Sequence, residues 1–237
     1  MLLEIAVFNI QSAILAEAAR ADRLELCENP NDGGTTPSYG TLVSAKEKIS
    51  IPIFPIIRPR GGDFFYSDAE FEVMKKDILL CKSLGFEGVV FGLLNIDGSI
   101  DIKRTSLLVL LAYPMEVTFH RAFDRANNPF NAMEDIIACS CQRILTSGQV
   151  PNAFDGKNLI KELIVKTEHR IIIMPGSGVR SNNIKELAQF TGADELHSSA
   201  RKIIFSPMKF INDTMNEDQK NILVDEDEIR SMKDEMR

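Results

Sequence analysis

The chain has 237 residues, of which 44% are hydrophobic and 26% are charged, and its formal net charge is −7. This length suits a one-domain α/β barrel with a large core, and the composition is ordinary for a globular protein. The acidic charge disfavours nucleic acid and anionic membrane surfaces as partners, and no apolar stretch approaches the roughly 20 residues that span a bilayer.

The N-terminal segment and the cysteines indicate a cytoplasmic protein. The first five residues, MLLEI, include an acidic residue and no basic one, so they are typical of a first strand rather than a signal peptide. Four irregularly spaced cysteines are too few for a disulfide framework and fit a reduced compartment. Cys139 and Cys141 form a C-x-C pair, which favours buried or helix-end thiols over a metal site.

Short apolar runs alternate along the chain with segments of helical periodicity. The predicted strands are Leu2–Val7, Arg23–Cys27, Pro52–Ile57, Gly88–Phe91, Met115–Phe119, Arg143–Leu145, Ile171–Met174 and Asp194–His197. The predicted helices are Ile10–Arg20, Tyr39–Lys48, Ser67–Leu84, Ile102–Leu111, Asn131–Ala138, Gly156–Lys166 and Ser181–Phe190. Strands separated by helices of this length form right-handed βαβ units, and eight units close a barrel. The sequence therefore predicts a single-domain (β/α)8 TIM barrel.

The C-terminal region has a different composition. We expect residues 1–212 to form the barrel and residues 213–237 to form an acidic linker and a final helix that packs on the barrel. The linker is rich in Asp, Glu, Asn and Lys, whereas Ile229, Met232 and Met236 have helical spacing.

Polar side chains gather within or just after the strands, where barrel enzymes place their sites. Side chains alternate between the two faces of a strand, and the apolar alternates should face the helices. This parity directs one set of residues into the lumen: Glu4, Glu25, Cys27, Arg58, Thr118, His120 and His197. Buried charges need partners, so the set can form a structural ion-pair network or a ligand site. We favour the site because barrel sites lie at this end of the strands. Glu116 and Glu195 should lie deeper and be structural.

Several loops offer groups for an anion. Gly176 and Gly178 follow the seventh strand, Ser199 and Arg201 follow the eighth, and Ser147 follows the sixth. Loops after strands seven and eight often bind phosphate in barrels, although a G-x-G sequence by itself is usually only a tight turn.

The loop after the third strand carries two arginines around a proline. Arg58 and Arg60 can clamp a carboxylate or phosphate, or they can form a rim network with Asp63 and Asp124.

Together these segments resemble the copper homeostasis protein CutC family. The matching segments are RLELCENPNDGGTTPS, IIRPRGGDFFYS, GVVFGLL, VTFHRAFD, RILTSG, IIMPGSGV and ELHSSAR, which cover most of the chain. The resemblance implies a cytoplasmic (β/α)8 barrel that forms homodimers or larger homo-oligomers and has a role in copper homeostasis with copper binding. It points to Glu25, Cys27, Arg58, Arg60, Asp63, His120, Arg121, Asp124, His197 and Arg201. The chain departs from the family pattern at Gln149 and Ser177, where glycine is usual.

Three functions remain open. In a copper-handling protein, Cys27, His120 and His197 would be the metal ligands, because cuprous ion prefers thiolate and accepts imidazole. In an enzyme acting on a small phosphorylated or carboxylated metabolite, His120 would be a general acid or base. In an oligomeric scaffold, the barrel mouth would be vestigial. No organic cofactor is expected.

The enzyme hypothesis assigns two groups of residues. The catalytic candidates are Glu4, Glu25, His120 and Asp124. The candidates for holding the anion are Arg58, Arg60, Arg121, Ser147, Gly176, Gly178, His197, Ser199 and Arg201.

Overall fold

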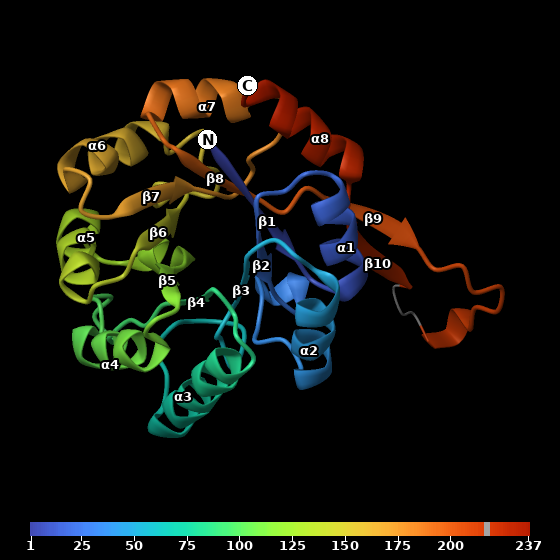
Figure 1. Ribbon diagram of the computed structural model, residues 1–237, viewed down its shortest axis with the longest axis horizontal. Coiled ribbons are helices and arrows are strands. Elements are labelled where there is room, and N and C mark those ends of the chain that lie inside the picture. The colour runs from blue at the N-terminus through green and yellow to red at the C-terminus, as the bar shows by residue number, and fades with distance from the viewer. Residues whose placement is uncertain (216–218) are drawn as a thin grey trace.

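The computed structural model describes residues 1–215 and 219–237, and it has a ring of parallel strands surrounded by helices (Figure 1). The barrel strands are β1 (Leu2–Val7), β2 (Arg23–Leu26), β3 (Ile53–Pro55), β4 (Gly88–Phe91), β5 (Glu116–Phe119), β6 (Arg143–Thr146), β7 (Ile172–Pro175) and β8 (Glu195–Ser198). The helices are α1 (Ile10–Ala18), α2 (Tyr39–Lys48), α3 (Asp68–Ser83), α4 (Ile102–Ala112), α5 (Pro129–Ala138), α6 (Lys157–Thr167), α7 (Ile184–Thr191) and α8 (Glu226–Glu235).

The strands form two parallel arcs, in the orders β3-β2-β1-β8 and β4-β5-β6-β7. A bridge between Ile56 and Val90 joins β3 to β4, and the Ile57 N–H donates to the Val90 carbonyl at 2.7 Å. At the other junction β7 lies against β8. The predicted (β/α)8 fold is therefore confirmed, and all the strand ends that carry the candidate site open on one face.

Local side-chain bonds set where the helices begin. Ser67 caps α3 and forms a reciprocal capping box with Glu70. Helix α7 begins at Ile184, three residues after the predicted Ser181. Its preceding turn is held by other partners, because Asn183 accepts from the Arg180 N–H and Glu228 accepts from the Ser181 N–H.

The deep half of the lumen holds a network of ion pairs that is buried except at Glu116, whose side chain is 51% exposed. Arg23 bonds to Glu4 and Glu195, and Arg143 bonds to Glu195 and Glu116. The Phe54 ring packs against both guanidinium groups, with centroid distances of 4.9 Å to Arg23 and 5.6 Å to Arg143. Glu195 thus takes the deep, buried position expected of it, whereas Glu116 lies at the solvent-exposed end of the network. The network fixes the floor of the candidate site.

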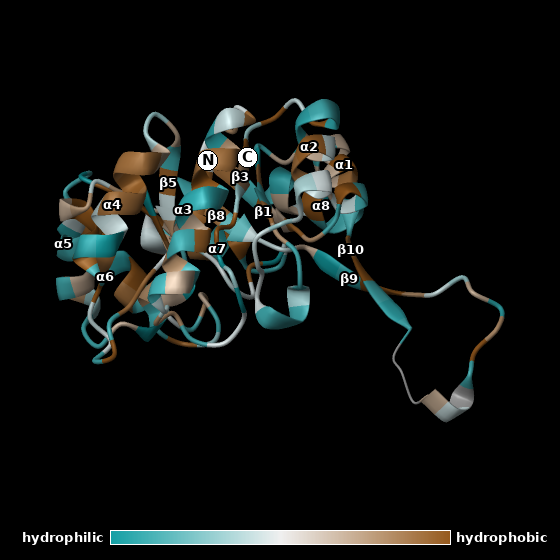
Figure 2. Cartoon of the chain, turned by 90° about the horizontal axis from the view of Figure 1, so that it is seen from below, coloured by the Kyte–Doolittle hydropathy of each residue, from teal (hydrophilic) through white to brown (hydrophobic). Residues whose placement is uncertain are grey.

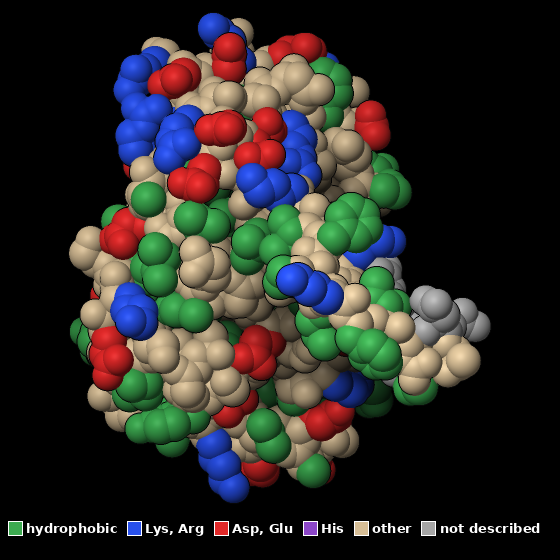
Figure 3. Space-filling view, turned by 90° about the vertical axis from the view of Figure 1, so that its right-hand side faces the viewer, with side chains coloured by type: hydrophobic (Ala, Val, Ile, Leu, Met, Phe, Trp, Pro, Cys, Tyr) green, Lys and Arg blue, Asp and Glu red, His purple; other side chains and the backbone are tan. Residues whose placement is uncertain are grey.

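The segment between β8 and α8 forms an antiparallel hairpin. It consists of β9 (Arg201–Phe205) and β10 (Lys220–Val224) and projects away from the barrel (Figures 1 and 2). Hydrophobic side chains are exposed on this side of the molecule (Figure 3). Phe205 on β9 and Phe210 in the segment that follows are among the exposed side chains. The barrel was expected to continue to residue 212, but two β-prone runs pair with each other here instead. Residues 216–218 of the predicted linker lie outside the described residues.

Helix α8 returns to the barrel and lies between α7 and α1 (Figure 1). Its Ile229 and Met232 side chains are fully buried. None of the helices in the described ranges is long and apolar enough to span a bilayer.

Candidate functional site

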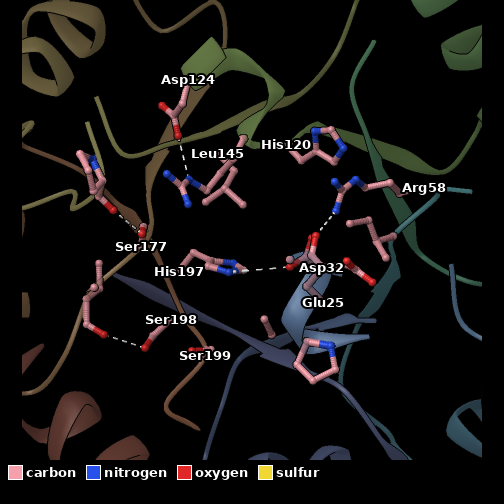
Figure 4. Close-up of a pocket in the computed structure, with 18 of the residues that line it drawn as sticks. Glu25, Asp32, Arg58, His120, Asp124, Leu145, Ser177, His197, Ser198 and Ser199 are labelled. Atoms are coloured by element: carbon pink, nitrogen blue, oxygen red, sulfur yellow. Dashed lines mark hydrogen bonds and ion pairs between the residues drawn. The ribbon is translucent and has the colours of Figure 1, made fainter. Parts of the chain in front are cut away.

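A cavity of about 860 Å³ opens at the carboxyl ends of the strands. Side chains from both arcs of the barrel converge on it (Figure 4). Of the predicted site residues, those that line it are Glu25, Arg58, His120, Arg121, Asp124, Gly178, His197, Ser199 and Arg201. Residues far apart in the sequence therefore line one cavity, and they include Glu25, Arg58, His120 and His197, which strand parity directed into the lumen.

His197 lies between two carboxyl groups on neighbouring strands. Its Nδ1 is 2.8 Å from Oε1 of Glu4, and its Nε2 is 3.7 Å from Oε2 of Glu25. Burial would lower the pKa of His197, but the bond to Glu4 and the charge of Glu25 raise it. Glu4 lies fully buried behind the imidazole, so it orients His197 and does not reach the cavity.

The two carboxyl groups differ in ionisation. Burial raises the pKa of Glu4, but the Arg23 guanidinium and His197 outweigh it and lower the pKa to about 2. Burial dominates at Glu25 and, together with the charge of Glu4, raises its pKa to about 7 despite His197. Glu25 can therefore gain or lose a proton near neutral pH, which suits a general acid or base.

Cys27 lies two residues beyond Glu25, is only 1% exposed and does not line the cavity. Burial and the nearby Glu25 charge raise the pKa of Cys27 well above its usual value. A thiol in such surroundings stays protonated, whereas the thiolate is the form that binds metals. The described residues contain no cluster of three or more His, Cys, Asp or Glu side chains that is arranged to hold a metal ion.

His120 lies at the end of β5 with its two ring nitrogens in different surroundings. Nδ1 accepts a hydrogen bond from the Ala122 N–H at 3.2 Å, while Nε2 is buried without a partner among the described residues. Burial and the Arg58 charge lower the pKa of His120 to about 3. The ring is therefore neutral at pH 7, which favours a hydrogen-bond donor over the general acid or base expected from the sequence.

Arg58 ties together the loops that follow β2 and β3. Its guanidinium donates to the carbonyl groups of Asp32, Gly34 and Gly62. It also stacks on the Phe64 ring at 4.9 Å from the centroid. These bonds fix the group in the cavity wall, so Arg58 is a rigid positive charge rather than a mobile clamp.

Asp124 joins the segment after β5 to the loop after β6. It accepts from Arg121 Nε at 2.8 Å, from the Ser147 N–H at 3.0 Å and from the Gln149 N–H at 3.1 Å. The Ser147 hydroxyl also accepts from Arg121 at 2.8 Å. With these donors around it, Asp124 positions Arg121 and the loop, and Ser147 lies fully buried behind them.

The loops after β7 and β8 form the far wall. Gly176 is structural, because a Cβ there would lie 2.5 Å from the Leu145 side chain. The departures from the family pattern, Gln149 and Ser177, have positive φ angles of 60° and 86°, where glycine is less strained. Arg180 donates to the Arg201 carbonyl at 3.1 Å, which links the two loops.

Some residues lie elsewhere than the sequence indicated, and others were missed. Arg60 lies outside the cavity, where it bonds to Asp63 and Glu70. Of the rim network that was the alternative to an anion clamp, the Arg60–Asp63 pair forms, whereas Asp124 pairs with Arg121. Arg125 and Arg180 line the cavity but were not predicted, because loop residues have no strand parity to reveal their direction. Their only signal in the sequence was proximity to Asp124 and to the glycine-rich turn.

Comparisons with known proteins identify the family. The CutC family model matches residues 1–202. The chain belongs to the CutC family. A CutC family protein of Chromobacterium violaceum is 49% identical over 209 residues, covering 88% of this chain and 85% of that protein. One of Parabacteroides distasonis is 50% identical over 215 residues, covering 90% and 88%.

Solved structures agree with this assignment. The crystal structure of a CutC protein from Streptococcus agalactiae, named for copper homeostasis, has a TM-score of 0.80 and 32% identity. It covers 84% of this chain and 98% of that one. Phosphoribosyl anthranilate isomerase of Thermotoga maritima has a TM-score of 0.61 at 13% identity, covering 99% and 98%, and shares the fold alone.

Proposed function

We propose that this CutC family member is an enzyme that binds a small phosphorylated or carboxylated metabolite in the barrel mouth and transfers protons through Glu25. The observation that carries the proposal is a titratable carboxyl group facing an arginine-rich cavity. The described lining includes Arg58, Arg121, Arg125, Arg180 and Arg201 against the carboxylates Glu25, Asp32 and Asp124. Arginines therefore outnumber carboxylates among these lining residues, although the whole chain has a net charge of −7. This excess of arginines supports an anionic ligand.

The positions of these residues assign anion binding to the arginines and proton transfer to Glu25. Arg180 lies on the loop after β7 and Arg201 is the first residue of β9, shortly after β8. Barrels commonly bind the anionic group of a substrate in this region. The Glu25 carboxyl group transfers the proton, and Nε2 of His197 lies 3.7 Å from its Oε2 atom. A carboxyl group with a pKa of about 7 is matched to proton transfer at neutral pH.

A thermal-shift screen of phosphorylated and carboxylated metabolites at fixed ionic strength tests this proposal. A ligand at 100 times its Kd should stabilise the protein by about 2.7 kcal/mol. Arg201→Ala should weaken the binding of such ligands, while Arg170→Ala, whose side chain pairs with Glu134, should not. Glu25→Gln should keep the binding and lose turnover. The proposal fails if no anion raises Tm, or if Arg201→Ala and Arg170→Ala bind equally.

Copper binding is the second candidate, and the name of the Streptococcus agalactiae relative favours it. We propose Cys27, His120 and His197 as its ligands. These side chains are not arranged as a metal site among the described residues, so binding would require them to move together. Cuprous ion would have to displace the thiol proton. Cys27→Ser should weaken cuprous binding and Cys139→Ser should not. Equal titration curves for the two variants would contradict this role.

We also propose a cytoplasmic location and a homodimer or larger homo-oligomer. All four cysteines are buried and free, which supports a reducing compartment. The apolar side chains exposed on the β9–β10 arm support self-association. Light scattering on the purified protein would measure the molar mass, and a monomer at all concentrations would refute the oligomer.

A further inference from the structure

We infer that His120 and Arg58 form a binding site for a carbonyl oxygen that becomes an oxyanion, so that the reaction is proton transfer at the carbon beside a carbonyl. This inference rests on the proposed function and deepens it by naming the substrate class and the reaction. It starts from two buried N–H groups that lack acceptors within residues 1–215 and 219–237, Nε2 of His120 and Nε of Arg58.

The surroundings of His120 determine which nitrogen carries the hydrogen. Because the Ala122 N–H donates to Nδ1 at 3.2 Å, the Nδ1 lone pair is occupied and the hydrogen resides on Nε2. Gly92 lies against the Nδ1 side of the ring, where a Cβ would be 2.6 Å from Nδ1. Nε2–H is thus a donor, and the ring that carries it lines the cavity.

The second donor belongs to a residue that packs on the same aromatic ring as His120. The His120 ring and the Arg58 guanidinium both pack on Phe64, each with a centroid distance of 4.9 Å. Three backbone carbonyls accept from the two terminal nitrogens of Arg58, and its Nε has no partner among the described residues. His120 and Arg58 are only 4% exposed. A buried donor without an acceptor costs about 1–3 kcal/mol, so its persistence in both residues points to a ligand oxygen.

The chemistry of this pair selects the ligand group. Both groups can only donate, so they require an acceptor such as a carbonyl oxygen. Donors that are already oriented stabilise a negative charge that develops on that oxygen, because they need no reorganisation. Glu25 and His197 lie across the lumen from His120, on strands β2 and β8 (Figure 4). A carbonyl compound between the two groups would have its oxygen at His120 and an adjacent C–H bond near Glu25.

The step balances without an oxidant or a cofactor. The Glu25 carboxylate removes the proton from the carbon beside the carbonyl, and the C–H electron pair becomes a C=C bond. The C=O π pair moves to oxygen, where His120 Nε2–H and Arg58 Nε–H stabilise the oxyanion. Glu25 then returns a proton to the same carbon, the oxyanion electron pair re-forms the C=O bond, and the compound is restored with a hydrogen from solvent beside its carbonyl.

Two phosphorylated probes separate this inference from the proposed function. Phosphoglycolohydroxamate mimics an enediolate oxyanion, whereas glycerol 3-phosphate carries the same phosphate without a carbonyl. The native protein should bind the hydroxamate at least about tenfold more tightly, the effect of roughly one charge-assisted hydrogen bond. His120→Leu should lose this preference and His120→Gln, which keeps an N–H donor, should retain most of it. Affinity for glycerol 3-phosphate should be the same in all three proteins, which also shows that the variants are folded.

Proton NMR supplies a readout that a merely structural histidine would not change. Adding the hydroxamate should move the His120 Nε2 proton resonance downfield, and glycerol 3-phosphate should not. In D2O, dihydroxyacetone phosphate should gain deuterium beside its carbonyl with the native protein but not with Glu25→Gln.

The outcomes distinguish the two claims. Equal affinity for both probes, an unmoved resonance or no deuterium uptake overturns the inference and leaves anion binding intact. If neither probe binds, the inference fails, while the proposed function is decided separately by the thermal-shift screen.

Discussion

Glu4 and Glu25 are both buried beside His197, yet their pKa values are shifted in opposite directions. Glu4 also contacts the Arg23 guanidinium, which keeps it ionised. Glu25 faces the cavity, and burial together with the charge of Glu4 favours its protonated form. Two carboxyl groups of the same residue type therefore have different roles because of their neighbours: Glu4 is a fixed charge and Glu25 is the group that titrates.

The stability of the Glu25→Gln variant tests this difference. A carboxyl group whose folded pKa is raised contributes stability that is fully present below pH 4.5 and lost as the pH rises to about 7. Glutamine removes that loss, so the variant should gain stability relative to the native protein between pH 4.5 and 7, by an amount on the order of 3 kcal/mol. Urea unfolding at a series of pH values measures it.

Glu4→Gln provides the opposite sign as a control. The pKa of Glu4 is lowered to about 2, so its contribution is present above pH 4.5 and lost as the pH falls through about 2. The stability deficit of this variant should therefore shrink in acid. Parallel pH profiles for the two variants would contradict the assignment of roles.

Among the elements, the strands were the most predictable and the loops the least. A strand has a period of two, so apolar residues on one face determine the direction of Glu25 and His197 from local sequence. The same parity places Arg23 inward beside Glu25, and the deep ion network follows from it. Loop side chains such as Arg60 take their positions from tertiary partners, here Glu70, which local sequence does not specify.

Asp124 is the residue that joins two of these loops, and Asp124→Asn should show it. Its side chain is 7% exposed and accepts from Arg121 and from two backbone N–H groups of the β6 loop. Asparagine loses the charge and one acceptor oxygen, so unfolding free energy should fall by about 2–3 kcal/mol. Asp63→Asn is the matched control, because that carboxylate also pairs with an arginine but is 71% exposed. The control should change stability by at most about 0.5 kcal/mol in urea unfolding, and equal losses would refute the joining role.

At the scale of the whole molecule, the segment after β8 divides into two parts with different roles. The family model ends at residue 202, close to the start of the projecting arm. Helix α8 occupies the place in the helical ring between α7 and α1 (Figure 1). Helical spacing in the sequence predicted α8, whereas the arm was missed, because pairing of β9 with β10 is a contact between segments far apart in the sequence.

The ring position of α8 makes the barrel depend on it. Ile229 is fully buried, and Glu228 bonds to Ser181 ahead of α7, so α8 closes the ring against both neighbours. Ile229→Ala should remove about 2–5 kcal/mol of stability, because it leaves a cavity between packed helices. Ile203→Ala on the arm deletes the same atoms from a side chain that is 62% exposed, and should change stability by at most about 0.5 kcal/mol. Calorimetry of the two variants measures the shifts in Tm. Similar shifts would contradict a larger contribution of α8 than of the arm to the stability of the barrel.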